Sequence, residues 1–209
     1  MKILFVSSEC APFSKSGGLA DVAFSLPPAL QKTGDDMAIV TPMYRVTQEN
    51  YGDEFERIKT CQIALGQRRL ACSLYRGALN GVTVYAIGNE HLFHRPRLYG
   101  YGDDSLRFAF FCRAVIDLLP EFGDLPDILH CNDWETALAI LYLKNDAVLR
   151  PELSHIKTVY TIHNIAYQGQ FGRSEMEATF ALPEGWYHGG LSYEFEGRQD
   201  INLMKGAML

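Results

Sequence analysis

The sequence has few cysteines, fewer basic than acidic residues and no long hydrophobic run. It holds only five cysteines among 209 residues, and no two of them have the spacing of a zinc ribbon. Disulfide-stabilised scaffolds and zinc ribbons are therefore disfavoured, and a reducing compartment is expected. Lysine and arginine number 19 against 25 aspartates and glutamates, so the net charge is −6. Nucleic-acid-binding domains usually carry a basic face, and we expect no nucleic-acid partner.

Long hydrophobic runs are also missing. The chain opens with Met1-Lys2, followed by only four strongly apolar residues, Ile3 to Val6. Such a run is too short for the core of a signal peptide and far too short to span a membrane. We therefore expect a cytoplasmic protein without a membrane partner.

The remaining composition is that of a globular α/β domain. Hydrophobic residues make up 47% of the chain and charged residues 21%. Short apolar runs predict strands that are buried on both faces of a parallel sheet: Ile3–Val6, Ala38–Val40, Ile128–Leu129 and Val159–Ile162. Helices are predicted between them over Leu19–Lys32, Leu106–Leu119 and Trp134–Lys144. This alternation predicts an α/β, Rossmann-like, doubly wound parallel sheet.

Three details refine this prediction. Pro27-Pro28 should kink or restart the first helix, and the helix over Leu106–Leu119 has so few polar residues that it should be almost wholly buried. An antiparallel excursion from the parallel sheet is expected in the middle of the chain. No helix is predicted between the strands Glu56–Ala64, Arg69–Tyr75 and Val82–Ile87, and Asn80-Gly81 is a typical hairpin turn sequence. Residues 202–209 are typical of the start of a buried helix that ends without a cap, which suggests a truncated chain or one half of a larger protein.

A glycine-rich loop follows the first strand. Lys15 precedes Gly17-Gly18 at the start of the first predicted helix. Backbone amides at two glycines, a helix N-terminus and a lysine suit a phosphate or diphosphate. The loop fits neither a P-loop nor a GxGxxG fingerprint. A flexible turn with a solvated lysine explains the spacing equally well.

Other polar segments follow later strands, where ligands bind in open α/β sheets. Asp133 is expected to cap the next helix, and Trp134 either belongs to the core or stacks on a sugar. His163-Asn164 is interpreted as a binding pair because of its place at the sheet edge.

Two further segments are ambiguous. The loop around Tyr99 either covers a carbohydrate or is an ordinary turn, with Asp103 or Asp104 capping the next helix. His91 and His94 lack a third ligand, so no metal site is assigned to them.

Four segments resemble one family, in the same order along the chain. The loop Lys15–Val22 is similar to the Lys-Thr-Gly-Gly-Leu signature that opens bacterial glycogen synthases and plant starch synthases. The other three are the aromatic loop with Leu98-Tyr99-Gly100-Tyr101, the segment Asn132-Asp133-Trp134 and the segment Thr161–Gly169. The resemblance extends over essentially the whole chain.

This resemblance implies a GT-B enzyme, which has two Rossmann-like domains with the active cleft between them. Residues 1–209 would form the N-terminal domain, and the C-terminal GT-B domain would be missing. The family transfers glucose from ADP-glucose to the non-reducing end of an α-1,4-glucan in glycogen biosynthesis, retains the anomeric configuration, and requires no metal or other cofactor. The matching catalytic positions are His163, Asp133 and Asp21, and the substrate-binding positions are Lys15, Gly17, Gly18, Tyr99 and Asn164.

The chemistry of these residues agrees with that implication. Lys15 and the amides of Gly17-Gly18 would stabilise negative charge that develops on the departing diphosphate. His163 would hold the glucose in register. It is not expected to be a nucleophile, because the sequence shows no base and orienting group for it.

Two departures from the family affect these expectations. Ser16 replaces the usual threonine and keeps its hydroxyl group. Glu135 stands where the family commonly has histidine or glutamine, which adds an anion near a cleft meant for ADP. The resemblance also implies that the second domain carries most contacts to adenine and diphosphate, so these 209 residues alone should bind ADP-glucose weakly and should not turn it over.

Two alternatives remain open at the level of sequence. The chain could be a catalytically silent module that binds a glucan or a nucleotide sugar through the same loops, or part of a GT-B enzyme with a different donor. The reading frame beyond Leu209 separates module from enzyme, because a second Rossmann-like half favours the enzyme and a stop codon favours the module.

Overall fold

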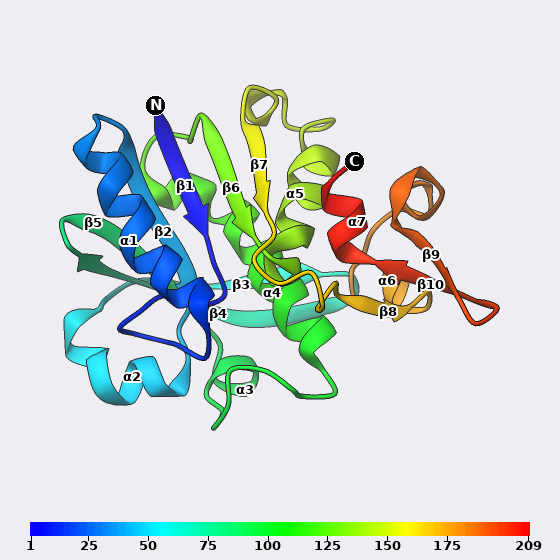
Figure 1. The fold of residues 1–209 in the computed structure, drawn as a ribbon, viewed down its shortest axis with the longest axis horizontal. Coiled ribbons are helices and arrows are strands. Elements are labelled where there is room, and N and C mark those ends of the chain that lie inside the picture. Colours follow the sequence, from blue (N-terminus) through cyan, green and yellow to red (C-terminus); the bar gives the residue numbers. More distant parts are fainter.

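The computed structural model describes residues 1–209, apart from the side chain of residue 195. Its main sheet has seven strands in the order β3-β4-β5-β2-β1-β6-β7 (Figure 1). The strands of this sheet are β1 (Lys2–Val6), β2 (Asp36–Pro42), β3 (Glu56–Leu65), β4 (Arg68–Leu79), β5 (Val82–Gly88), β6 (Ile128–Asn132) and β7 (Lys157–Thr161). The α-helices of at least five residues are α1 (Gly18–Lys32), α2 (Arg45–Tyr51), α4 (Asp104–Asp117), α5 (Trp134–Asp146) and α7 (Leu203–Ala207). Two four-residue α-helices are α3 (Glu90–Phe93) and α6 (Glu175–Ala178).

Five strands of this sheet are parallel, from β5 through β2, β1 and β6 to β7. Every predicted apolar run lies on one of these strands, except that Ile162 follows the end of β7, so the predicted α/β class with a parallel core is confirmed. Side chains of β1 alternate between two hydrophobic clusters: Ile3 and Phe5 belong to one, and Leu4 and Val6 to the other. Helix α1 contributes to the first cluster, and α4 and α5 to the second. The sheet is therefore covered on both faces.

The helices agree with the predictions except at the two prolines. Helix α1 is continuous from Gly18 to Lys32, with Pro27 and Pro28 inside it, so the predicted restart is wrong. Both prolines are buried, and their packing holds this stretch in the helix although proline removes a hydrogen-bond donor. Helix α4 is buried along most of its length, as predicted.

The antiparallel part of the sheet is also confirmed. Strand β3 pairs with β4 and β4 with β5, in both cases antiparallel. Asn80 and Gly81 join β4 to β5 with φ values of 50° and 85°. Positive φ at both central residues is typical of the type I′ turn that closes tight hairpins.

A second, smaller sheet near the C-terminus was not predicted. It contains β8 (Gln170–Gly172), β10 (Arg198–Asn202) and β9 (Ser192–Phe195), in that order, and lies beside α7 in orange and red (Figure 1). Its strands are too short to show a clear pattern in the sequence.

Asn202 caps α7 by accepting from the Lys205 amide, and most of the helix is buried, as expected. In the described part of the chain, no helix has the length and apolar character needed to cross a membrane.

Candidate functional site

A cavity of about 850 Å³ lies at the carboxyl edge of the parallel sheet. Strands β1, β6 and β7 are neighbours and run in the same direction (Figure 1). The segments that follow them meet at this edge, together with the loop that precedes α4. Six of the eight predicted site residues line the cavity: Gly17, Gly18, Tyr99, Asp133, His163 and Asn164.

Glycines 17 and 18 leave open space at the start of α1. Gly17 is the N-cap residue, and no side chain caps the helix there. A Cβ atom built on either glycine would meet nothing within 4 Å. Neither glycine is therefore required by packing within this chain, and the space beside the helix N-terminus can accept a ligand that carries negative charge.

Glu9 holds this loop in place, a role that the sequence did not reveal. Its side chain is only 4% exposed. Oε2 accepts from the amides of Ser16 at 2.6 Å and Gly17 at 3.1 Å, and Oε1 accepts from the hydroxyls of Ser16 at 2.6 Å and Tyr99 at 2.9 Å. The amide of Gly17, predicted to bind diphosphate, is thus already bonded to a carboxylate of the chain. The only sequence signal was an acidic residue three positions after the end of β1.

Lys15 and Asp21 lie beside the cavity without lining it. They form an ion pair of 2.6 Å between Lys15 Nζ and Asp21 Oδ1, and their side chains are 51% and 59% exposed. Exposed ion pairs contribute little to stability, so an anionic ligand can compete with Asp21 for the lysine.

Asp133 connects the segments after β6 and β7. It precedes α5 but makes no side-chain capping bond, so the predicted capping role is wrong. Instead, Asp133 Oδ1 accepts from the backbone amides of His163 at 2.7 Å and Asn164 at 3.2 Å. Its φ of 58° lies in the left-handed region that few residues other than glycine adopt. This backbone conformation and the two bonds fix His163 and Asn164 at the cavity wall.

The ring of His163 has a defined hydrogen-bond partner, Asn132. The Asn132 amide nitrogen donates to the carbonyl groups of Val6 at 3.0 Å and His130 at 3.2 Å, which leaves its Oδ1 as an acceptor. His163 Nε2 lies 2.9 Å from this Oδ1 and therefore donates to it. In the neutral ring, Nδ1 is then the acceptor. Asn132 was not predicted, since nothing in the sequence pairs it with His163.

Glu135 is a buried carboxyl group in the cavity wall. Burial raises its pKa, its own backbone amide lowers it, and the nearby charges of Asp133, Glu9 and Asp104 raise it further, to about 8. Its Oε2 has no hydrogen-bond partner among the described residues. The expected extra anion is therefore mostly neutral at pH 7, because a group with this pKa keeps its proton there.

Aromatic side chains form one wall of the cavity. Tyr99 is half-buried, and its hydroxyl oxygen lies 2.9 Å from both Ser8 Oγ and Glu9 Oε1, of which the Glu9 carboxylate accepts its single proton. Trp134 is half-buried and lies between Phe108 and Phe171, with ring centroids 5.3 and 5.5 Å away. Because Trp134 packs on the core and also lines the cavity, both of its predicted roles are compatible with its position.

Two other predictions concerned helix capping by Asp103 or Asp104 and the histidines His91 and His94. Asp103 makes no capping bond, and Asp104 Oδ2 accepts from the amides of Gly100 and Tyr101. His94 Nδ1 lies 3.4 Å from Gln48 Oε1. Among the described residues, no group of three or more histidine, cysteine or acidic side chains could hold a metal ion.

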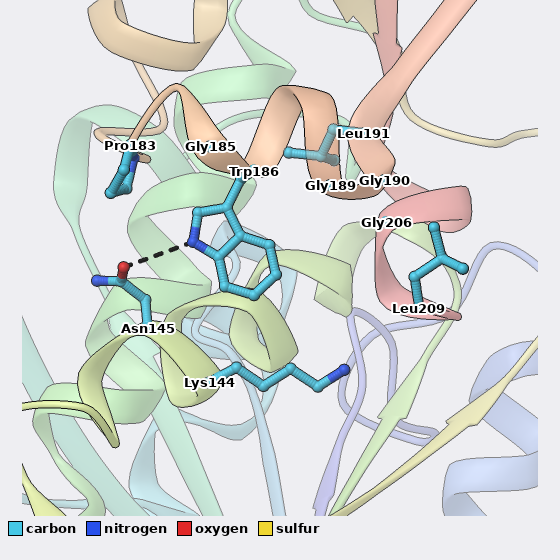
Figure 2. A pocket seen from close by; sticks show the side chains of 10 residues that line it. All are labelled: Lys144, Asn145, Pro183, Gly185, Trp186, Gly189, Gly190, Leu191, Gly206 and Leu209. Atoms are coloured by element: carbon cyan, nitrogen blue, oxygen red, sulfur yellow. Dashed lines mark hydrogen bonds between the residues drawn. The ribbon is translucent and has the colours of Figure 1, made fainter.

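A second cavity, of about 430 Å³, lies at the far end of α5. Figure 2 shows Trp186 above Lys144 and Asn145, with Gly206 and Leu209 to one side. Trp186 Nε1 donates to Asn145 Oδ1 at 3.5 Å. Helix α5 begins at the first cavity and has 13 residues, so about 20 Å separates its two ends. No predicted site residue lines this second cavity.

Comparison with known proteins gives consistent matches over the whole chain. The family described as the starch synthase catalytic domain matches residues 2–209. A glycogen synthase of Geobacillus thermodenitrificans is 41% identical over 211 residues, and one of Clostridium novyi is 42% identical over 210 residues. Both matches include the whole of this chain but only 42% and 43% of the relatives. The chain thus spans less than half the length of these proteins.

A solved structure shows the same fold. The catalytic domain of starch synthase IV from Arabidopsis thaliana, bound to ADP and acarbose, has a TM-score of 0.83 to this chain and is 29% identical to it. The match includes 99% of this chain and 42% of that one.

Proposed function

Because this chain belongs to the starch synthase catalytic domain family, we propose that it is the N-terminal part of a glycogen synthase. In this proposal, the enzyme transfers glucose from ADP-glucose to the non-reducing end of an α-1,4-glucan and retains the anomeric configuration. The fold is that of the N-terminal half of a GT-B glycosyltransferase. A related starch synthase was solved with ADP and acarbose, which supports a nucleotide and a glucan as the ligand classes.

One observation carries the proposal. The N-terminus of α1 and the segment 163–164, held by Asp133, line the same cavity at the carboxyl edge of the sheet. The first can stabilise a diphosphate, and the second offers hydrogen-bond groups for sugar hydroxyls. A nucleotide sugar needs both environments next to each other.

Each group then has a distinct task. Breaking the bond between glucose and ADP leaves negative charge on the diphosphate, which the start of α1 at Gly18 and the released Lys15 would stabilise. His163 would orient the sugar and contact its hydroxyl groups through ring or backbone atoms. Asp21 would hold Lys15 in reach until the ligand binds, since the two now form an ion pair.

The proposal includes a second domain. Residues 1–209 would be the first of two Rossmann-like domains, and the second would supply most contacts to adenine and further positive charge for the diphosphate. The cavity wall here is instead rich in carboxyl groups, from Glu9, Asp104, Asp133 and Glu135. We therefore expect the 209-residue chain to bind ADP-glucose weakly and to transfer no glucose.

Calorimetric titration of ADP-glucose and of a maltooligosaccharide into the chain tests the proposal. Lys15→Ala should weaken ADP-glucose binding by about tenfold or more, because a hydrogen bond to a charged group contributes about 1.5–3 kcal/mol. Lys32→Ala is the matched control, since Lys32 lies in the last turn of the same helix. Equal affinity in Lys15→Ala would remove the role given to this lysine.

Two results would contradict the wider proposal. Absence of binding for both ligands at millimolar concentration would argue against the cavity as the binding site. Efficient transfer of labelled glucose to glycogen by the chain alone would show that a second domain is not needed.

A further inference from the structure

Two cysteines face each other on the antiparallel strands at the edge of the main sheet. Cys61 on β3 is paired directly with Cys72 on β4, and both are free thiols. Directly opposed residues point to the same side of a sheet. Here that side packs on the hydrophobic cluster that includes α4: Cys72 belongs to the cluster and Cys61 packs against it. The two thiol groups therefore share one small region beneath the helix.

The spacing of such a pair is close to that of a disulfide. Opposed residues in antiparallel strands have Cβ atoms about 4.5–5.5 Å apart, and a disulfide spans about 3.5–4.5 Å between Cβ atoms. Closing the bond thus requires an approach of about 1 Å. Strand β3 is the edge strand and pairs only with β4, and its register already shifts between Arg57 and Lys59. An edge strand with an irregular register can make this adjustment.

The two thiols differ in access. Cys72 is 1% exposed, whereas Cys61 is half-buried and reachable from solvent. Burial raises the pKa of Cys72, and the neighbouring Cys61 raises it further. Cys61 is therefore the thiol that meets an oxidant first.

We propose that Cys61 and Cys72 form a reversible cross-strand disulfide when the chain meets a small-molecule disulfide such as oxidised glutathione. The Cys61 thiolate attacks one sulfur of the oxidant, which forms a mixed disulfide and releases one glutathione thiolate. The Cys72 thiolate then attacks the Cys61 sulfur and releases the second glutathione. Two protein thiols are oxidised, one disulfide is reduced to two thiols, and the protons of Cys61 and Cys72 pass through solvent to the two glutathione thiolates.

The remaining cysteines are not expected to compete. Cys10, Cys112 and Cys131 are fully buried, so no oxidant reaches them in the folded chain. The bond would close a ring around the turn between β3 and β4 and would fasten the edge strand to its neighbour. This inference is independent of the proposed function, since neither cysteine lines the cavity at the carboxyl edge.

Mass spectrometry of the oxidised chain tests the inference. The folded chain is incubated with oxidised glutathione, quenched with acid, alkylated in denaturant and digested with trypsin. Cleavage after Lys59, Arg68, Arg69 and Arg76 places Cys61 and Cys72 on different peptides. We expect these two peptides to be joined, the other three cysteines to be alkylated, and the link to disappear after treatment with dithiothreitol.

Two variants make the result specific. Cys61→Ser should form no linked peptide, and Cys72→Ser should stop at a mixed disulfide of Cys61 with glutathione. Circular dichroism confirms that each variant is folded. A wild-type chain that keeps five free thiols, that stops at glutathionylated Cys61, or that links a different pair would overturn the inference.

Discussion

Replacing Glu135 with glutamine removes a buried carboxyl group while keeping the size of the side chain. Glu135 is 9% exposed, and its Oε2 has no partner among the described residues. Burial raises its pKa from 4.5 to about 8, with contributions from nearby carboxylates. The substitution should therefore change how the stability of the chain depends on pH.

The size of the effect follows from the two pKa values. At about 1.4 kcal/mol per pH unit, ionising Glu135 in the folded chain costs roughly 5 kcal/mol more than in the unfolded chain. Between pH 4.5 and about 8, the folded chain keeps this proton and the unfolded chain releases it. Glu135 therefore does not reduce the unfolding free energy below pH 4.5. It reduces this free energy as the pH rises from 4.5 to about 8, and it causes no further loss above that range.

Urea unfolding at about pH 5 and about pH 9 measures this difference. Relative to the wild type, Glu135→Gln should gain several kcal/mol of unfolding free energy between the two conditions, on the order of 4 kcal/mol. The buried amide of glutamine carries its own cost of about 1–3 kcal/mol, but that cost does not depend on pH and cancels in the comparison. Glu54→Gln, at an exposed glutamate, should show no such gain.

A pH-independent difference between Glu135→Gln and the wild type would refute this reasoning. Titration of the Glu135 side-chain carbon by NMR gives a direct second measurement. A midpoint near the ordinary value for glutamate would show that the carboxyl group is solvated in the folded chain.

Two further substitutions test the geometry of the cavity wall. Gly169→Ala should destabilise the chain by about 1–3 kcal/mol and shift the fluorescence of Trp134. The reason is that Gly169 has a φ of 63° and an added Cβ would lie 2.7 Å from the Trp134 ring. Unchanged stability and fluorescence would contradict this close contact. Asp133→Asn keeps the oxygen that accepts from the amides of His163 and Asn164 but removes a negative charge, so the pKa of Glu135 should fall. An unchanged midpoint in the NMR titration of Glu135 would mean that this charge does not act on Glu135.

The sequence alone predicted the parallel core and the edge of the sheet at which the cavity lies. Continuous apolar runs predicted the strands β1, β2, β6 and β7, although β7 is an edge strand and Val159 on it is 40% exposed. Parallel neighbours place their carboxyl ends at one edge, so polar residues directly after such strands meet there. For that reason the segments after β1, β6 and β7 were expected at one edge of the sheet, whereas the assignment of Gly17, Gly18, Asp133, His163 and Asn164 to one site came from the resemblance to the family.

Only the tertiary structure decided which atoms these residues contact. Glu9 binds the Ser16 amide and the Tyr99 hydroxyl, although Tyr99 lies 90 residues away along the chain. Asp133 was expected to cap its own helix, but its carboxylate binds amides 30 and 31 residues later. A capping bond depends on neighbouring residues and can be predicted locally, whereas these bonds depend on how β1, β6 and β7 bring distant loops together. The partners of a buried carboxylate are set by that arrangement, because each such group must find its hydrogen bonds among whatever the fold places beside it.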